Sequence, residues 1–363
     1  MVAICYVLVY NVVMSGMKYR GFLVLFSIFL AGGAFAQADL QPAAIVNLTR
    51  SEPITVKQFR TEVERMEKTA RRTLNDSERR EVLDAMINER LAIQAAEKER
   101  ITVAESEVNR QIDQLKAQMV QALGRPPTDA EFATAIRNET GLDLAAFREQ
   151  ARRQLIAQKY LLSKKQSVID SLKEPTEQEI VYEYNLAKAQ FVRPDTVRFS
   201  MIQVDYGPDA AAKTKAKELA DRLFREIGTS PSKFDEVVLR GQAPNSGYQA
   251  GDGGYLPRNR EAAQVVGQEF INTAFSLKQG EVSKLMEGVR GYQIVKITET
   301  YAQKTLELDE IFQLGTRMTV RDYIRGALLQ QRQMEVLTQA TQELVAELRA
   351  GKTFQVFDKN LVW

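Results

Sequence analysis

The chain has 363 residues, of which 44% are hydrophobic and 26% charged, a composition typical of a globular protein with two or three domains. Its 49 lysines and arginines nearly balance 47 aspartates and glutamates, and the formal net charge of +2 argues against nucleic acid as a partner. The chain has no histidine, which excludes Ser-His-Asp triads, Cys-His pairs and imidazole metal ligands.

The first 36 residues have the pattern of a secretory signal peptide. Lys18 and Arg20 form a short basic region, an uncharged apolar run follows, and small residues end the segment at Ala36. We expect cleavage after Ala36, with residues 1–16 an upstream extension that comes from a misplaced start. The alternative is a retained membrane anchor, because the apolar stretch that includes residues 1–16 is long enough to span a bilayer.

Cleavage would also define the chemistry of the exported chain. It would remove Lys18, Arg20 and the single cysteine, Cys5, so the formal net charge falls from +2 to 0. A chain without thiols forms no disulfides and cannot be misoxidised in an oxidising compartment. The sequence therefore predicts the bacterial periplasm as the location.

Residues 37–175 are predicted to be mostly helical after one short strand over residues 43–48. The clearest helical period lies in residues 77–99, where inward positions recur at three- and four-residue steps. These positions are Val82, Leu83, Met86, Ile87, Leu91, Gln94 and Ala95. Further helices are predicted over residues 104–123, from Thr128 onward with capping chemistry, and over residues 144–164.

A boundary at Glu174-Pro175 separates this segment from a connector helix over residues 176–194. From residue 195 to residue 300 the pattern changes to mixed helix and strand. The expected elements are a strand over 197–204, helices over 210–227 and 232–239, a glycine-rich loop over 247–254, a helix over 268–275 and a strand over 291–298.

Residues 301–363 return to helix and end in a strand. A long amphipathic helix is predicted over residues 319–348, followed by a short strand over 354–357. A lone terminal strand must pair with another strand, and residues 43–48 are the obvious candidate. We therefore predict that the two chain ends meet in one domain.

Four blocks in residues 195–300 resemble, in order, the parvulin family of peptidyl-prolyl isomerases. They are Phe234 to Val238, Gly251 to Leu256, Phe270 to Ser283, and Gly291 to Ile297. The glycine block alone could suggest a phosphate-binding loop, but it lacks the Gly-Lys-Ser/Thr of that motif. The resemblance implies an α/β domain with a four-stranded antiparallel sheet and surrounding helices.

The flanking segments resemble the chaperone domain of SurA/PrsA-type periplasmic foldases. The resemblance is carried by Val82 to Leu91, by Ile101 to Val103, and by the long C-terminal helix. It implies an α+β fold in which residues 37–175 and 301–363 form a mostly helical chaperone domain. The parvulin-like domain of residues 195–300 is inserted between these two segments.

Parvulins surround the twisting amide with an apolar wall and polar side chains, because prolyl isomerisation makes no covalent bond. The resemblance places the apolar wall at Val266 and Phe270. The two positions at which parvulins typically carry histidine fall at Met201 and Gln293. The loop before the glycine block, Gln242 to Asn245, has neither the Cys nor the Asp found there in the family.

We therefore expect a proline-binding pocket whose catalysis is impaired or absent. Its expected residues are Met201, Val266, Phe270, Phe275 and Gln293. Phe270 is equally well explained as a core residue of its helix. Gln293 can hydrogen-bond to an amide but cannot titrate.

These features predict an ATP-independent chaperone, with no cofactor and no metal, that binds unfolded or extended segments of exported envelope and outer-membrane proteins. The membrane is contacted only transiently, through the signal peptide. The alternative is an active peptidyl-prolyl cis-trans isomerase that uses the reduced pocket of Phe270, Val266, Met201 and Gln293 to assist folding.

Overall fold

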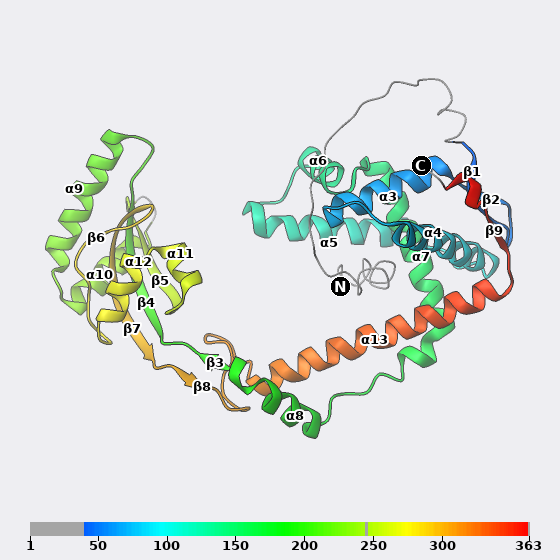
Figure 1. Cartoon of the computed structure of the whole chain (residues 1–363). Helices are drawn as coiled ribbons and strands as arrows, with labels where there is room; N and C mark the ends of the chain where they lie inside the picture. The colour runs from blue at the N-terminus through cyan, green and yellow to red at the C-terminus, as the bar shows by residue number, and fades with distance from the viewer. Residues whose placement is uncertain (1–39, 244–245, 362–363) are drawn as a thin grey trace. The chain divides into compact units, whose positions relative to one another are not determined.

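The computed structural model describes residues 40–243 and 246–361, which form two compact units (Figure 1). The first unit comprises residues up to 173 together with residues from 331 onward, and the second comprises residues 174–330. The predicted signal peptide and its cleavage site lie outside the described residues. Within the two described ranges, no helix is both long and apolar enough to cross a membrane.

The first unit is mostly helical, with a small sheet at the chain ends. Its elements are β1 (Pro42–Val46), β2 (Glu52–Thr55), α3 (Val56–Ala70), α4 (Asp76–Lys98), α5 (Glu105–Leu123), α6 (Asp129–Thr140), α7 (Leu144–Ile169), the later part of α13 (Val320–Ala350), β9 (Phe354–Val356) and the 3₁₀ turn η2 (Asp358–Asn360). The predicted cap at Thr128 is confirmed, since its hydroxyl accepts the N–H of Glu131 while the Glu131 carboxylate accepts that of Thr128.

The sheet of the first unit joins the two ends of the chain. Its strand order is β2-β1-β9, and both pairings are antiparallel, with Ala44 opposite Val356 (Figure 1). The predicted pairing of the first and last strands is therefore confirmed. The inner strand β1 is buried at Ala43, Ala44 and Val46, which pack with α3 and α4 into one hydrophobic core.

One buried polar side chain ties this sheet to α4. Gln94 is fully buried, and its Oε1 atom accepts the backbone N–H groups of Leu48 and Thr49, each at 3.0 Å. Its Nε2 atom donates to Glu52 at 3.1 Å. The backbone N–H groups of Leu48 and Thr49 follow the end of β1 and have no partner on a neighbouring strand. A side chain of helix α4 thus accepts their hydrogen bonds.

The second unit is a mixed α/β module preceded by a short helix. Its elements are α8 (Glu177–Ala187), the 3₁₀ turn η1 (Lys188–Gln190), β3 (Val192–Arg193), β4 (Thr196–Asp205), α9 (Ala210–Ile227), α10 (Pro231–Gly241), β5 (Gln249–Pro257), α11 (Arg260–Val266), α12 (Gln268–Ser276), β6 (Met286–Glu287), β7 (Gly291–Tyr301), β8 (Lys304–Thr305) and the start of α13.

A four-stranded antiparallel sheet of order β5-β4-β7-β6 forms the centre of this unit. Alternate residues of β4 and β7 pack on opposite faces. Ile202, Val204 and Ile294 pack with residues of α9 and α10, whereas Phe199 and Val295 pack with residues of α11 and α12. The predicted α+β class, with a four-stranded sheet set into a mostly helical protein, is confirmed.

Two segments that flank the module belong to the second unit through a shared core. Tyr184 and Phe191, from residues 176–194, pack with Leu306, Val320 and Ile324 from the segment after residue 300. The structure thus divides the chain near residues 173 and 330, where sequence patterns alone place the limits of the inserted module at 195 and 300.

The predicted glycine-rich loop is in fact largely the edge strand β5. Gly253 lies on this strand, where a Cβ atom would approach the Phe199 ring to 2.2 Å. The glycine therefore allows the Phe199 ring to pack closely against β5. This close packing explains why glycine stands in an extended segment, where it otherwise weakens a strand.

Candidate functional site

One face of the second unit's sheet gathers four of the five residues predicted to form the pocket. Phe270 belongs to a buried cluster on this face, and Met201, Val266 and Phe275 are half-buried against it. Met201 comes from β4, Val266 from α11, and the two phenylalanines from α12. These four side chains therefore belong to one contiguous apolar set, which is called the apolar wall below.

Phe270 lies deep in this set. It is 4% exposed, and its ring meets Phe199 edge to face with the ring centroids 5.4 Å apart. Because Phe199 also contacts Gly253, the three residues form a continuous set of contacts from strand β5 to α12. Met201, Val266 and Phe275 are the members of the wall that remain partly accessible.

Gln293, the fifth predicted residue, belongs to a chain of amides on the same face. Its Nε2 atom donates to Oε1 of Gln203 at 3.0 Å, and Nε2 of Gln203 donates to Asp205 at 2.5 Å. The Oε1 atom of Gln293 is buried and accepts no hydrogen bond from any described residue. Gln293 and Gln203 lie directly opposite each other on β7 and β4.

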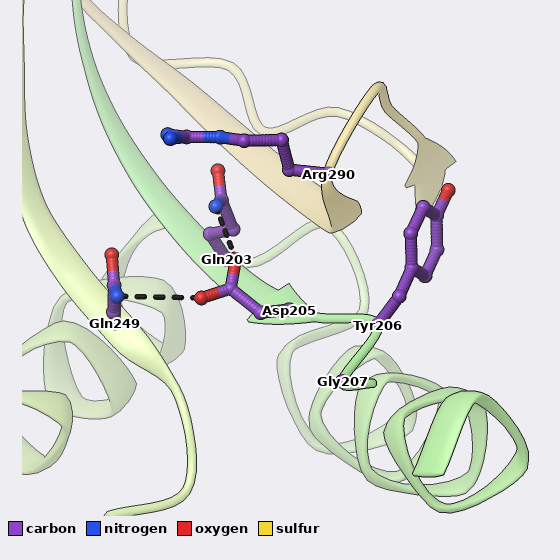
Figure 2. A pocket seen from close by; sticks show the side chains of 6 residues that line it. All are labelled: Gln203, Asp205, Tyr206, Gly207, Gln249 and Arg290. Carbon is purple, nitrogen blue, oxygen red and sulfur yellow. Dashed lines mark hydrogen bonds between the residues drawn. The ribbon is translucent and has the colours of Figure 1, made fainter. Parts of the chain in front are cut away.

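The amide chain leads to a pocket of about 340 Å³ at the end of β4 (Figure 2). This volume is at the lower end of the range of small-molecule and side-chain pockets in proteins. The pocket is lined by Gln203, Asp205, Tyr206, Gly207, Gln249 and Arg290. Figure 2 shows Asp205 between the two glutamines, with Gln249 donating to its second oxygen at 3.4 Å.

The polar groups around this pocket differ in how they are satisfied. The hydroxyl of Tyr206 donates to the Gly288 carbonyl at 2.7 Å, and burial together with nearby Glu287 raises its pKa. The Arg290 side chain extends above Gln203 in Figure 2 and forms no ion pair with a described residue. With no histidine in the chain, the lining offers hydrogen bonds and charge but no imidazole to transfer protons near pH 7.

Four of the lining residues are not among those predicted from the sequence, namely Gln203, Asp205, Gln249 and Arg290. A signal existed for Gln203, because it follows Met201 by two residues on a strand and must share its face. The contribution of Arg290 depends on the turn between β6 and β7, which no local pattern predicts. Of the loop before the glycine block, residues 244–245 lie outside the described residues.

A metal centre has no support in the part of the chain that the structure describes. Within residues 40–243 and 246–361, no group of three or more Asp, Glu or Cys side chains is placed to hold a metal ion.

Two family models match the chain in succession. A model described as a SurA-like N-terminal domain matches residues 16–161, and one described as a PPIC-type PPIase domain matches residues 175–312. The chain is of the SurA/PrsA type. Its second unit is accordingly the PPIC-type domain, and the sheet face described above belongs to that domain.

Individual relatives carry both names of the SurA/PrsA type. Chaperone SurA of Saccharophagus degradans is 25% identical over 282 residues, which are 75% of this chain and 61% of the relative. Chaperone SurA of Alcanivorax borkumensis is 30% identical over 228 residues, which are 61% of this chain and 47% of the relative. Foldase protein PrsA of Clostridium botulinum is 22% identical over 290 residues, with 78% and 75% covered.

Solved structures include a SurA-like chaperone of Campylobacter jejuni that is 14% identical, with a TM-score of 0.36 and coverage of 87% of this chain and 100% of that one. The chain spans about three fifths or less of the length of the SurA relatives named above.

Proposed function

We propose that this protein is an ATP-independent periplasmic chaperone that binds unfolded or extended segments of exported envelope and outer-membrane proteins. Membership of the SurA/PrsA type supports a role in folding. The N-terminal pattern of a basic region, an apolar run and a small-residue end at Ala36 supports export. The relatives named Chaperone SurA support a role in binding client chains.

We further propose that the PPIC-type domain binds proline or aromatic side chains and is degenerate in catalysis. Rotation about an X–Pro bond faces a barrier of roughly 18–20 kcal/mol, and catalysis requires polar groups that favour the twisted amide over the planar one. In this domain the two positions typical of parvulin histidines are Met201, which packs in an apolar cluster, and Gln293, whose N–H is held by Gln203. This replacement is the observation that carries the proposal.

The sheet face has an apolar part and a polar part, which would contact different groups of a client. Met201, Val266 and Phe275 provide apolar surface for a client side chain, above a floor of Phe270. Beside it, the Oε1 atom of Gln293 is an acceptor without a described partner, and its hydrogen bonding does not depend on pH near neutrality. Such a surface binds peptide segments weakly and tolerantly, which suits a chaperone with many clients.

Two assays on the mature chain test this function. Without ATP, the protein should suppress the aggregation of a urea-unfolded outer-membrane protein on dilution. In a proline-peptide assay, cis/trans exchange should proceed at the uncatalysed rate. Failure to suppress aggregation would overturn the chaperone function.

The second assay also decides whether the domain is an active isomerase. Catalysed exchange that is lost in Phe270→Ala would establish the isomerase and overturn the degenerate domain. Because Phe270 is buried, its truncation costs about 3–5 kcal/mol and could unfold the domain. The half-buried Val266→Ala is therefore measured alongside it, with circular dichroism of both variants.

A further inference from the structure

Strand β5 contains the one Asp-Gly pair of the sequence, Asp252-Gly253, and the sequence has no Asn-Gly pair. An Asp-Gly bond is chemically labile, because glycine has no side chain to shield its backbone nitrogen from the preceding carboxyl group. Asp252 and Gly253 are both exposed, so water reaches them. This pair is therefore the part of the chain most prone to spontaneous rearrangement of the backbone.

We propose that Asp252-Gly253 is a latent isomerisation site and that Arg198 protects it through its ion pair with the Asp252 carboxylate. The backbone nitrogen of Gly253 is the nucleophile, and the Cγ atom of Asp252 is the electrophile. The proposal concerns the chemical lifetime of the folded chain, and it does not depend on the binding of clients.

The rearrangement has two steps and consumes no reagent other than water. In the first step the Gly253 nitrogen bonds to Cγ of Asp252 and gives up its proton, and one carboxyl oxygen leaves as water. The product is a five-membered succinimide ring. In the second step water adds to the main-chain carbonyl of Asp252, and the bond from that carbon to the nitrogen breaks. The backbone then runs through the side-chain carbon as isoaspartate, with no net change in mass.

The packing of β5 retains the two reacting residues. A side chain at Gly253 is disfavoured, because its Cβ atom would approach the Phe199 ring to 2.2 Å. Gly253 is the extra residue of a bulge and has no residue opposite it on β4. Oδ1 of Asp252 accepts the N–H of Gly254 at 2.9 Å, which turns the side chain toward the residues that follow it. The electrophilic carbon is thus directed to the side of Asp252 on which the Gly253 nitrogen lies.

Arg198 opposes the first step by keeping the carboxylate ionised. Its Nη2 atom donates to Oδ2 of Asp252 at 2.6 Å, and its Nε atom donates to Oδ1 at 3.4 Å. An ionised carboxylate is a poor electrophile, since an oxygen leaves as water only after it is protonated. The hydrogen bond from Arg198 is the main cause that lowers the pKa of Asp252, so few molecules carry the protonated carboxyl near neutral pH.

The other titratable groups around Asp252 do not supply a second positive charge. Glu299 of β7 accepts a hydrogen bond from Nη1 of Arg198 at 2.9 Å, so two carboxylates share one guanidinium. The Tyr255 ring lies 5.3 Å from the Arg198 Cζ atom, and Tyr301 donates to Glu299. Among the described residues, Arg198 is the one cation that pairs with Asp252.

The test measures the formation of isoaspartate at residue 252 in the purified chain near neutral pH. Methyl transfer from a labelled donor by protein isoaspartyl methyltransferase quantifies the product, and fragmentation of tryptic peptides locates it. A synthetic peptide of residues 249–257 gives the rate without the fold. We expect the folded chain to form isoaspartate at least about tenfold more slowly than this peptide.

Three variants of the chain identify the residue responsible. Arg198→Gln should raise the rate about threefold to tenfold, and Arg198→Lys, which keeps a cation, should raise it less. Arg325→Gln is the matched control, since the Arg325 side chain is 37% exposed against 36% for Arg198 and likewise pairs with two carboxylates. It should leave the rate unchanged.

A fourth variant separates loss of charge from loosening of the strand. Glu299→Gln removes one partner of Arg198 and keeps its cation beside Asp252, so the rate should not rise. An equal increase in Glu299→Gln and Arg198→Gln would assign the effect to looser packing and overturn the proposal. A wild-type rate equal to that of the peptide would also overturn it, as would an unchanged rate in Arg198→Gln. Circular dichroism establishes that each variant folds, and the wild type and Arg198→Lys still provide the comparison with the peptide if Arg198→Gln does not.

Discussion

Gln94 is a polar residue in the one helical stripe that the sequence predicts most clearly, and it is fully buried. A buried amide is stable only when its donors and acceptors are paired, since each unpaired group costs about 1–3 kcal/mol. Gln94 meets this condition by accepting N–H groups that follow β1 and by donating to Glu52. Gln94 therefore has a structural role in the core, where it binds the segment after β1 to helix α4.

Replacement of Gln94 tests this role. Gln94→Ala leaves the N–H groups of Leu48 and Thr49 without an acceptor, and we expect the first unit to lose about 2–4 kcal/mol of stability. Hydrogen exchange of the β1 amides in urea would measure the loss. The exposed Gln114→Ala on α5 is the control and should stay within about 0.5 kcal/mol. Equal exchange in the two variants would contradict the prediction.

At the scale of elements, β5 shows how a glycine-rich segment can be a strand. Its glycine at position 253 is needed because the Phe199 ring occupies the space of a side chain, and that ring supports Phe270. The edge strand β5 thus contacts the apolar wall through the Phe199 ring. A change at the glycine should reach the candidate pocket.

Gly253→Ala should destabilise the second unit by about 1–3 kcal/mol, because the new methyl group overlaps the Phe199 ring. Thermal unfolding of the variant measures the effect, and Phe199→Leu in the same chain should relieve part of it. Gly326→Ala is the control, since its Cβ meets open space on helix α13. That control should be neutral or stabilise the protein by about 0.5–1 kcal/mol. Unfolding of Gly253→Ala at the wild-type temperature would refute the overlap.

Some strand pairings can be predicted from the sequence and others cannot. The pairing of residues 43–48 with 354–357 was predictable, because a strand at each end of a helical domain has one available partner. Strand β2 was missed because Pro53 is typical of edges and turns, and β2 is indeed an edge. The contact between Gln203 and Gln293 depends on the register of β4 against β7, which no local pattern contains.

At the scale of the whole molecule, the absence of histidine leaves no side chain that ordinarily titrates between pH 5.5 and 7.5. Carboxylates paired with cations titrate at lower pH instead. The hydrogen bond from Arg125 lowers the pKa of Glu131 to about 2, and Arg198 likewise lowers the pKa of Asp252. Both carboxylates are ionised at neutral pH in the folded chain.

The pH dependence of unfolding follows from these shifts. A carboxyl whose pKa is lower in the folded state stabilises the protein above its unfolded pKa, near 4.5 for Glu131, and this contribution is lost as the pH falls toward 2. We expect the free energy of unfolding to be constant between pH 6 and 8 and to fall below about pH 4.5. Urea titrations at a series of pH values measure the free energy of unfolding in both pH ranges.

Glu131→Gln provides the matched variant, since it removes the titrating group and keeps the side-chain shape. Below about pH 4.5, the free energy of unfolding should fall less steeply with pH in this variant than in the wild type. Between pH 6 and 8 it should again not vary with pH. A slope between pH 6 and 8 in the wild type would show a titrating group that the sequence does not contain.

The β2-β1-β9 sheet imposes an order on the assembly of the protein. Synthesis from the N-terminus delivers β1 early, yet one edge of that strand stays unpaired until Phe354–Val356 follow. All strands of the second unit emerge in between, so that unit can complete its sheet first. The helical unit therefore stays incomplete while the second unit folds, and its sheet closes only when the last strand becomes available.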